Sequence, residues 1–124
     1  MTNVTELIDR YIQMWNETDA ERRRKLIEQI WTEAASYVDP MMQAEGHAGI
    51  DAMVQGVQDG FPGYRFRRTS EVDAHHTCVR FTWELGPEDG AAFAGGVDFG
   101  VIVDERLQAI TGFLDFAPNP AEQT

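Results

Sequence analysis

The N-terminal half of the chain carries apolar residues at the spacing of amphipathic helices. In residues 4–17, apolar positions recur every three or four residues, which places them on one helix face. Similar patterns predict helices over residues 20–31 and about 50–60, and Asn3 and Asp19 are suitable N-caps for the first two. The apolar face of the first helix comprises Val4, Leu7, Ile8, Tyr11, Ile12 and Trp15.

The C-terminal half instead alternates apolar and polar residues, which is typical of strands with one buried face. A short strand over residues 35–39 precedes it, and residues 41–49 are expected to form a loop or a loose hairpin. Helices followed by an antiparallel meander predict one α+β domain over residues 1–124, with the helices on one face of the sheet. The long strands are expected over residues 64–72, 78–85, 92–103 and 107–116.

One predicted strand has two faces of different character. Gly96, Asp98 and Gly100 share one face, and the other face is built from valine and phenylalanine. Glycine inside a strand marks a bend or a close approach, so we expect a concave face that lines a cavity, with Asp98 pointing into it. The apolar opposite face would need a cover, and we therefore predict a homodimer through this outer face of the sheet.

Composition narrows the partners and the location. The net charge is −11, so we expect no binding to nucleic acid, whose phosphates such a surface repels. No apolar run approaches the roughly 20 residues that span a bilayer, so we expect no membrane insertion. The first residues lack the apolar segment of a signal peptide, and the lone Cys78 is expected to be a small packed hydrophobe. We expect the protein in the cytoplasm.

Charged and metal-binding side chains have plain structural interpretations. The basic run of residues 22–25 lies in a predicted helix and is expected to form a solvated face. His75 and His76 are adjacent, so on a strand they would face opposite sides and could not share an ion. His47 lies in a predicted loop, where it could be a zinc ligand or a mobile gate over the pocket mouth. We favour the gate and expect no metal site.

Three stretches of the chain, in this order, resemble a known family. The first helix carries Arg10-Tyr11 followed by Asn16 and Asp19, the first strand ends in Tyr37-Val38-Asp39-Pro40, and a later strand carries Gly96-Val97-Asp98-Phe99. Together they resemble the nuclear-transport-factor-two-like superfamily, in its SnoaL-like and ketosteroid-isomerase-like branch. The resemblance covers nearly the whole chain. It implies a cone-shaped fold with three helices packed on a curved, mostly antiparallel sheet that encloses an apolar pocket.

The resemblance also implies roles for three residues. In ketosteroid isomerases, an aspartate before proline at the end of the first strand is the general base, and a helix tyrosine with a protonated aspartate forms the oxyanion hole. By position, Asp39 would be the base, and Tyr11 and Asp98 would be the oxyanion donors. Val57 stands near the place of a supporting tyrosine in the isomerases, so the hydrogen-bond network around Tyr11 is expected to differ.

The residue chemistry is compatible with those roles. Two carboxyls in one apolar pocket should have their pKa values pushed apart, and such a pair can move a proton at neutral pH. Asp39 is equally interpretable as a turn former before Pro40, and Tyr11 as a core aromatic. A small apolar organic ligand is expected to contact Trp15, Tyr37, His47, Phe61, Phe81, Trp83, Leu114 and Phe116.

The sequence thus supports two functions in one fold. The leading hypothesis is an enzyme that needs no cofactor and transfers a proton next to a carbonyl, as an isomerase, cyclase or dehydratase. The alternative is a non-catalytic domain that binds an apolar ligand or only dimerises. Epoxide hydrolysis is disfavoured, because the stretch Arg80-Phe81-Thr82 lacks the carboxylate that such relatives carry.

Overall fold

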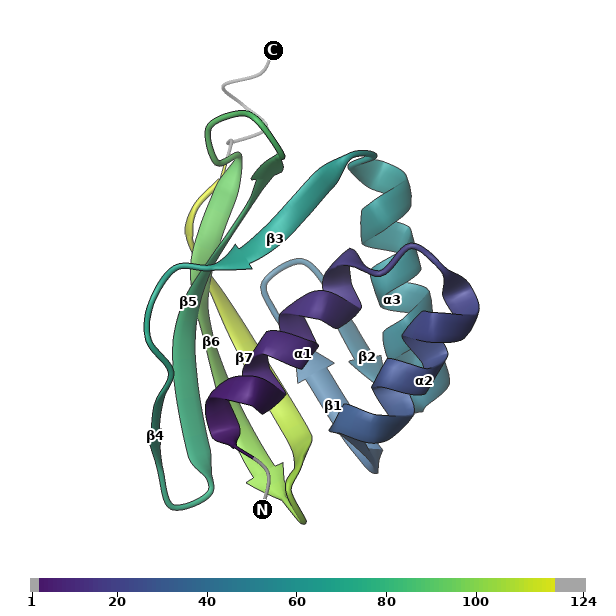
Figure 1. Ribbon diagram of the computed structural model, residues 1–124, viewed down its shortest axis with the longest axis vertical. Helices are drawn as coiled ribbons and strands as arrows, with labels where there is room; N and C mark the ends of the chain where they lie inside the picture. The colour runs from purple at the N-terminus through teal and green to yellow at the C-terminus, as the bar shows by residue number, and fades with distance from the viewer. Residues whose placement is uncertain (1–2, 118–124) are drawn as a thin grey trace.

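Three helices pack on the concave side of one curved sheet, as Figure 1 shows. The computed structural model describes residues 3–117. The helices are α1 (Val4–Asn16), α2 (Ala20–Ile30) and α3 (Gly46–Gly60). The α+β fold that the sequence predicts is confirmed.

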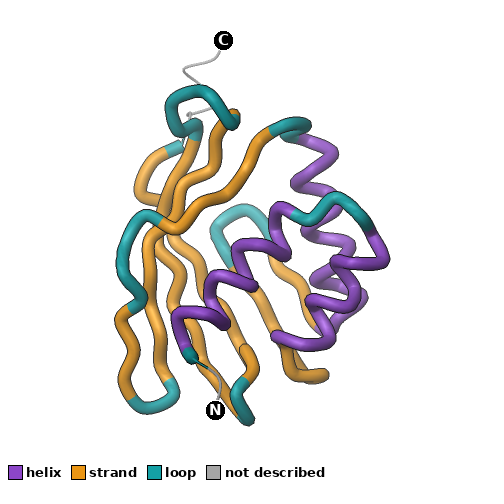
Figure 2. The backbone as a smooth tube through the Cα atoms, in the orientation of Figure 1, coloured by secondary structure: helices purple, strands orange, loops and turns teal. Residues whose placement is uncertain are grey.

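Over the described residues the sheet has seven strands and stays open. Its order is β2-β1-β7-β6-β5-β3, and β4 also pairs with β5. The pairs are antiparallel except β1 and β7, whose parallel pairing joins the N-terminal half of the chain to the C-terminal strands. Figure 2 shows these strands as one layer beside the helices. They are β1 (Trp31–Val38), β2 (Gln43–Glu45), β3 (Tyr64–Arg68), β4 (Asp73–His75), β5 (Cys78–Pro87), β6 (Ala94–Val103) and β7 (Arg106–Phe116).

Side-chain caps and apolar faces set the first two helices as expected. Asn3 Oδ1 accepts hydrogen bonds from the amides of Thr5 and Glu6, and Asp19 caps α2 in the same way. The apolar face of α1 is buried against the sheet, which fixes the direction in which its tyrosine and tryptophan point. Its buried residues are Leu7, Ile8, Tyr11, Met14 and Trp15.

Two boundaries differ from the sequence-based prediction. Trp31 begins β1 instead of ending a helix, and the strand therefore starts before residue 35. A register shift between Trp31 and Ser36 breaks the alternation of buried residues, which hides the strand start from pattern analysis. The hairpin alternative for residues 41–49 agrees with the antiparallel pairing of β1 and β2, but the first turn of α3 also falls in this segment, because Gly46 adopts a φ of 72° and starts the helix early.

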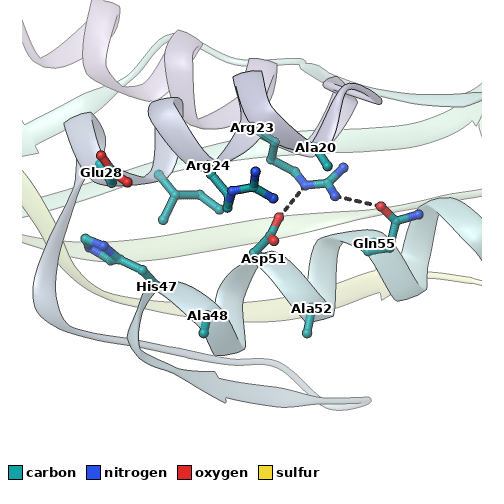
Figure 3. Close-up of a pocket in the computed structure, with 10 residues that line it drawn as sticks. Ala20, Arg23, Arg24, Glu28, His47, Ala48, Asp51, Ala52 and Gln55 are labelled. Carbon is teal, nitrogen blue, oxygen red and sulfur yellow. Dashed lines mark hydrogen bonds and ion pairs between the residues drawn. The ribbon is translucent and has the colours of Figure 1, made fainter.

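Arg23 is buried, so the prediction of a solvated basic face is wrong at this position. Its guanidinium donates to Asp51 Oδ1 at 2.6 Å, to Gln55 Oε1 at 2.6 Å and to Gln58 Oε1 at 3.1 Å. A fourth bond reaches the carbonyl of Glu17 at 2.8 Å. Figure 3 shows the side chain extending from α2 to Asp51 and Gln55 on α3. This ion pair fixes α3 against α2.

The outer face of the sheet is apolar and exposed, as the glycine-strand pattern indicates. Phe99 and Phe113 meet edge to face there, with ring centroids 5.8 Å apart. Nothing in the described chain covers this face, and the homodimer stays a prediction. The exposed apolar residues on these strands include Phe99, Val101, Val103, Phe113 and Phe116.

Candidate active site

A cavity of about 950 Å³ lies between the helices and the concave face of the sheet. Residues of α1, α3, β1, β5, β6 and β7 contribute to its wall. The wall is mostly apolar and aromatic, which is the usual character of a site for a small organic molecule. Among the lining residues are Trp15, Phe61, Phe66, Trp83, Phe93 and Leu114.

Asp98 is the buried acid of this cavity. It lies in the middle of β6 and is 3% exposed. The hydroxyl of Tyr11 donates to Asp98 Oδ2 at 2.9 Å, and the indole N–H of Trp83 donates to Asp98 Oδ1 at 3.0 Å. Because α1 crosses the concave face, a helix donor and a strand donor reach the same carboxyl from two sides.

Burial changes the protonation of this group. Desolvation raises the pKa of Asp98 to about 7, partly opposed by the hydrogen bonds from Tyr11 and Trp83 and supported by the nearby charge of Asp39. Near neutral pH the carboxyl is therefore close to half protonated. Burial, together with Asp98, also raises the pKa of Tyr11, so this phenol keeps its proton.

Asp39 lines the same cavity from the end of β1. Its Oδ1 accepts the amides of Met41 at 2.8 Å and Met42 at 3.0 Å, and its Oδ2 accepts the hydroxyl of Tyr37 at 2.7 Å. The residue thus forms the turn into β2 while it faces the cavity. Both sequence-based interpretations of Asp39, as turn former and as pocket acid, agree with its position.

Gly112 of β7 lies beside both acidic side chains. Strand β7 lies between β1 and β6, and Asp98 is directly opposite Gly112 in the β6–β7 register. An ideal Cβ on Gly112 would lie 2.9 Å from Asp98 Oδ1 and 3.2 Å from Asp39 Cβ. The hydroxyl of Tyr37 is 3.5 Å from the same point. The missing side chain at Gly112 therefore leaves the space that both acids share.

Sequence analysis did not assign Gly112 to the site. The available signal was a glycine inside a predicted strand, which marks a close approach of other groups. Three methionines, Met41, Met42 and Met53, also line the cavity without having been assigned to it. The first two lie in the segment that was expected to be a loop or a loose hairpin. Its pairing with β1 brings them to the cavity wall.

Most of the predicted ligand contacts lie on the cavity wall, but two predicted aromatic contacts do not. Trp15, Tyr37, Phe61, Trp83 and Leu114 line the cavity. Phe81, Phe116 and His47 are not among the residues that line it. The alternation of apolar and polar residues does not predict where these three side chains lie.

Phe81 and Phe116 are the displaced aromatic residues. Phe81 faces inward but lies beneath Tyr11, with ring centroids 5.8 Å apart, and is fully packed in the core. Phe116 is on the outer face and 46% exposed. A register shift between Gly95 and Gly96 inserts one extra residue into β7, so the residues after it change sides. The prediction that both rings line the pocket is wrong.

His47 does not gate this cavity. It lies in the first turn of α3, and its Nε2 contacts the carbonyl oxygens of Trp31 at 3.1 Å and Thr32 at 3.0 Å. The side chain lines a smaller hollow of about 420 Å³ between α2 and α3, shown in Figure 3. The buried cation of that hollow, Arg23, already has its partners.

Two further predictions need correction. His76 adopts a φ of 52°, which breaks the alternation and places the Nδ1 atoms of His75 and His76 3.1 Å apart, so the two rings do not face opposite sides. Cys78 is exposed, because Val79 takes the inward position on β5.

Within residues 3–117, no three His, Cys, Asp or Glu side chains gather in a way that could hold a metal ion. No helix in this range is long and apolar enough to cross a membrane.

Comparisons with known proteins agree with this architecture. The sequence profile of the SnoaL-like domain matches residues 8–110. A solved structure of a candidate isomerase of the SnoaL-like family from Agrobacterium tumefaciens is 43% identical, with a TM-score of 0.85. The match covers 90% of this chain and 96% of that chain. Among curated proteins, none matches the chain.

More distant structures share the fold. A candidate ketosteroid isomerase from Kribbella flavida is 21% identical, with a TM-score of 0.69, and the match covers 94% of this chain and 80% of that one. A candidate polyketide cyclase from Sinorhizobium meliloti is 10% identical, with a TM-score of 0.68 and coverage of 86% and 93%. At these identities the likeness concerns the fold alone.

Proposed function

Since the chain belongs to the SnoaL-like family, we propose that it is a small-molecule enzyme that transfers a proton next to a carbonyl. Isomerisation, cyclisation and dehydration of an apolar substrate all contain such a step. The observation that carries the proposal is that Asp39 and Asp98 lie beside Gly112 and line one apolar cavity. Acid–base catalysis requires a proton acceptor and a proton donor held at one place.

In this proposal Asp39 is the base, and Oδ2 is the atom that takes the proton. Oδ1 is held by the two loop amides of Met41 and Met42, which keep the carboxylate oriented. Oδ2 has one partner, the hydroxyl of Tyr37, which turns away when Oδ2 takes the proton. A carboxylate fixed in this way loses little orientational freedom when a substrate arrives.

Tyr11 and Asp98 act on the carbonyl oxygen of the substrate. When Asp98 is protonated, its own O–H is one donor to a developing oxyanion, and the O–H of Tyr11 becomes the second once it turns from Asp98 Oδ2 to the substrate. Trp83 holds the other oxygen of Asp98 at 3.0 Å, which keeps the carboxyl aimed at the cavity. The apolar surroundings strengthen each of these bonds relative to water.

The test follows exchange of the protons next to a ketone, because exchange reports proton abstraction without knowledge of the natural substrate. A panel of ring ketones that includes 2-tetralone is incubated in D₂O, and loss of the proton signals is followed by NMR. The protein is expected to accelerate exchange for at least one ketone. Replacing Asp39→Asn is expected to lower that rate about 10²- to 10⁴-fold.

The matched control is Asp73→Asn, which removes an exposed carboxylate outside the cavity and is expected to leave the rate unchanged. Exchange by the Asp39→Asn variant at the unaltered rate would show that another group is the base. A protein that accelerates exchange of no ketone in the panel would refute catalysis.

A non-catalytic binding domain is the second candidate, and one observation favours it. The polar groups of the cavity already satisfy one another, since Asp39 accepts three hydrogen bonds and Asp98 accepts two. Such pairing suits a stable, water-excluding ligand site that performs no chemistry. The exchange experiment separates the two candidates, because a binding domain leaves ketone exchange at the rate of buffer.

A further inference from the structure

The charge facing the main cavity is one-sided. Asp39 and Asp98 both line it, and among its lining residues in the described chain there is no Lys, Arg or His. Buried carboxyls are normally paired with a cation or neutralised by a proton. The buried cation of the described chain, Arg23, is bound to Asp51 on the far side of α3 and serves neither acid. The cavity therefore lacks a positive partner of its own.

In the protein without a ligand, a proton on Asp98 reduces the negative charge of the cavity. Asp98 has two hydrogen-bond donors, which favour its ionised form, yet burial still raises its pKa to about 7. The titratable groups that line the cavity with it are Tyr11 from α1, Tyr37 from β1 and Asp39 from the turn after β1. Burial raises the pKa of both tyrosines, so neither phenol ionises near neutral pH.

The wall offers aromatic rings to a cation as well. Trp15 packs against Phe66 with centroids 5.0 Å apart, and Phe66 packs against Trp83 at 5.6 Å. The three rings line the cavity together, and Trp83 also donates to Asp98. Aromatic faces beside carboxylates attract organic cations through the ring quadrupole and bury their apolar parts at the same time.

We infer that this cavity binds hydrophobic ammonium ions, with the cation inside the cavity facing Asp98 and Asp39 and the apolar part against the aromatic wall. The ammonium takes the place of the proton on Asp98, and the ligand occludes the site for neutral molecules. The inference rests on the proposed function only in using the same cavity as the ligand site. It requires no turnover.

The affinity for an ammonium ion should depend on pH, because the cation replaces the proton on Asp98. An ammonium ion binds the ionised form of Asp98, whose fraction grows as the pH rises through about 7. An aliphatic amine stays protonated up to about pH 9, so its affinity should rise about tenfold or more between pH 5.5 and pH 8. A neutral ligand of the same shape should gain nothing over this range.

The experiment compares three ring-matched probes by isothermal titration calorimetry. They are 1-naphthylmethylamine, 1-naphthalenemethanol and 1-naphthoic acid, which carry positive, no and negative charge. At pH 8 the amine is expected to bind at least tenfold more tightly than the alcohol, and the acid at least tenfold more weakly than the alcohol. Equal or tighter binding of the alcohol or the acid would overturn the inference.

Two variants test whether Asp98 is responsible for the preference for the amine. Asp98→Asn is expected to reduce the amine-to-alcohol affinity ratio at least fivefold and to remove its rise with pH, whereas Asp73→Asn should keep both. An unchanged ratio in folded Asp98→Asn protein would contradict the inference. If that variant does not fold, the pH profile of the ratio in the unaltered protein decides: a rise supports the inference, and a flat profile refutes it.

The result is separable from the proposed catalysis. Amine preference without ketone exchange would leave the inference standing and reject the enzyme. Ketone exchange without amine preference would support the proposed enzyme and reject the binding of ammonium ions.

Discussion

At the scale of single residues, the site depends on a position that has no side chain. Gly112 lies on β7 between β1 and β6, and a Cβ at this position would contact both Asp98 and Asp39. The polar residues around it follow from their types: Tyr11 and Trp83 are large apolar groups with one donor each, and each donor finds the buried carboxyl.

A methyl group at this position should disturb both acids. In the Gly112→Ala variant the new Cβ would lie 2.9 Å from Asp98 Oδ1, which is closer than the two atoms tolerate. We expect a loss of about 1 to 3 kcal/mol in the free energy of unfolding, measured with urea, and a lower rate of ketone exchange.

Gly60→Ala is the control for this change, because a Cβ there has no neighbour within 4 Å. It lies at the end of α3 and should leave both quantities near their original values or raise the stability slightly. Equal behaviour of the two variants would show that Gly112 does not separate the acids.

Residue chemistry in the sequence pointed to part of this site. The glycine-lined strand face predicted that Asp98 points into a cavity, and the apolar helix face predicted that Tyr11 is buried. The roles of both came from the family resemblance, and both residues lie at the cavity. Phe116 was assigned from strict alternation and lies on the opposite face, because one extra residue in β7 reverses the sides. A bulge of this kind leaves no mark in the pattern of hydrophobic residues.

At the scale of elements, the position of α3 decides the shape of the cavity. The helix supplies Met53, Val57 and other wall residues, and it is fixed to α2 through Arg23. The spacing of Arg23, Ile27 and Ile30 places the arginine on the buried face of α2. The period of the helix thus predicts burial here, whereas the run of basic residues suggested a solvated face.

Removal of this arginine should loosen α3. In the Arg23→Ala variant Asp51, Gln55 and Gln58 lose their shared donor, and a partly buried carboxylate is left unpaired. We expect a loss of about 3 to 5 kcal/mol in the free energy of unfolding, followed by urea denaturation.

The neighbouring Arg24→Ala is the control, since Arg24 is exposed and should change stability by less than about 0.5 kcal/mol. If both variants were equally stable, the buried ion pair would not be what holds α3 in place.

Element identity was easier to predict than element boundaries. The caps at Asn3 and Asp19 and the apolar stripe of α1 are local, so pattern analysis located α1 and α2 well. The start of β1 depends on its pairing with β7, and the early start of α3 depends on a single glycine conformation. Neither feature is a property of a short window of sequence.

At the scale of the whole molecule, the outer face of the sheet is an exposed apolar surface. Phe113 is 52% exposed and lies against Phe99, beside exposed valines of β6. An apolar surface of this kind is typical of an interface between protein copies, and we propose a homodimer through it.

Sedimentation velocity tests the dimer. The unaltered protein should sediment as a dimer, and more completely in 0.5 M salt than at about 0.02 M, because two chains of net charge −11 repel each other. Phe113→Glu should sediment as a monomer. The matched change Gln13→Glu on α1 should not affect the dimer, and a monomeric unaltered protein would contradict the proposal.

The whole account requires that burial in the cavity raises the pKa of Asp98. Titration of the aspartate carboxyl carbons by ¹³C NMR between pH 3 and pH 9 measures this directly. We predict one carboxyl that titrates near pH 7, and its absence in the Asp98→Asn variant. Titration of every aspartate below about pH 5 would contradict the shared site.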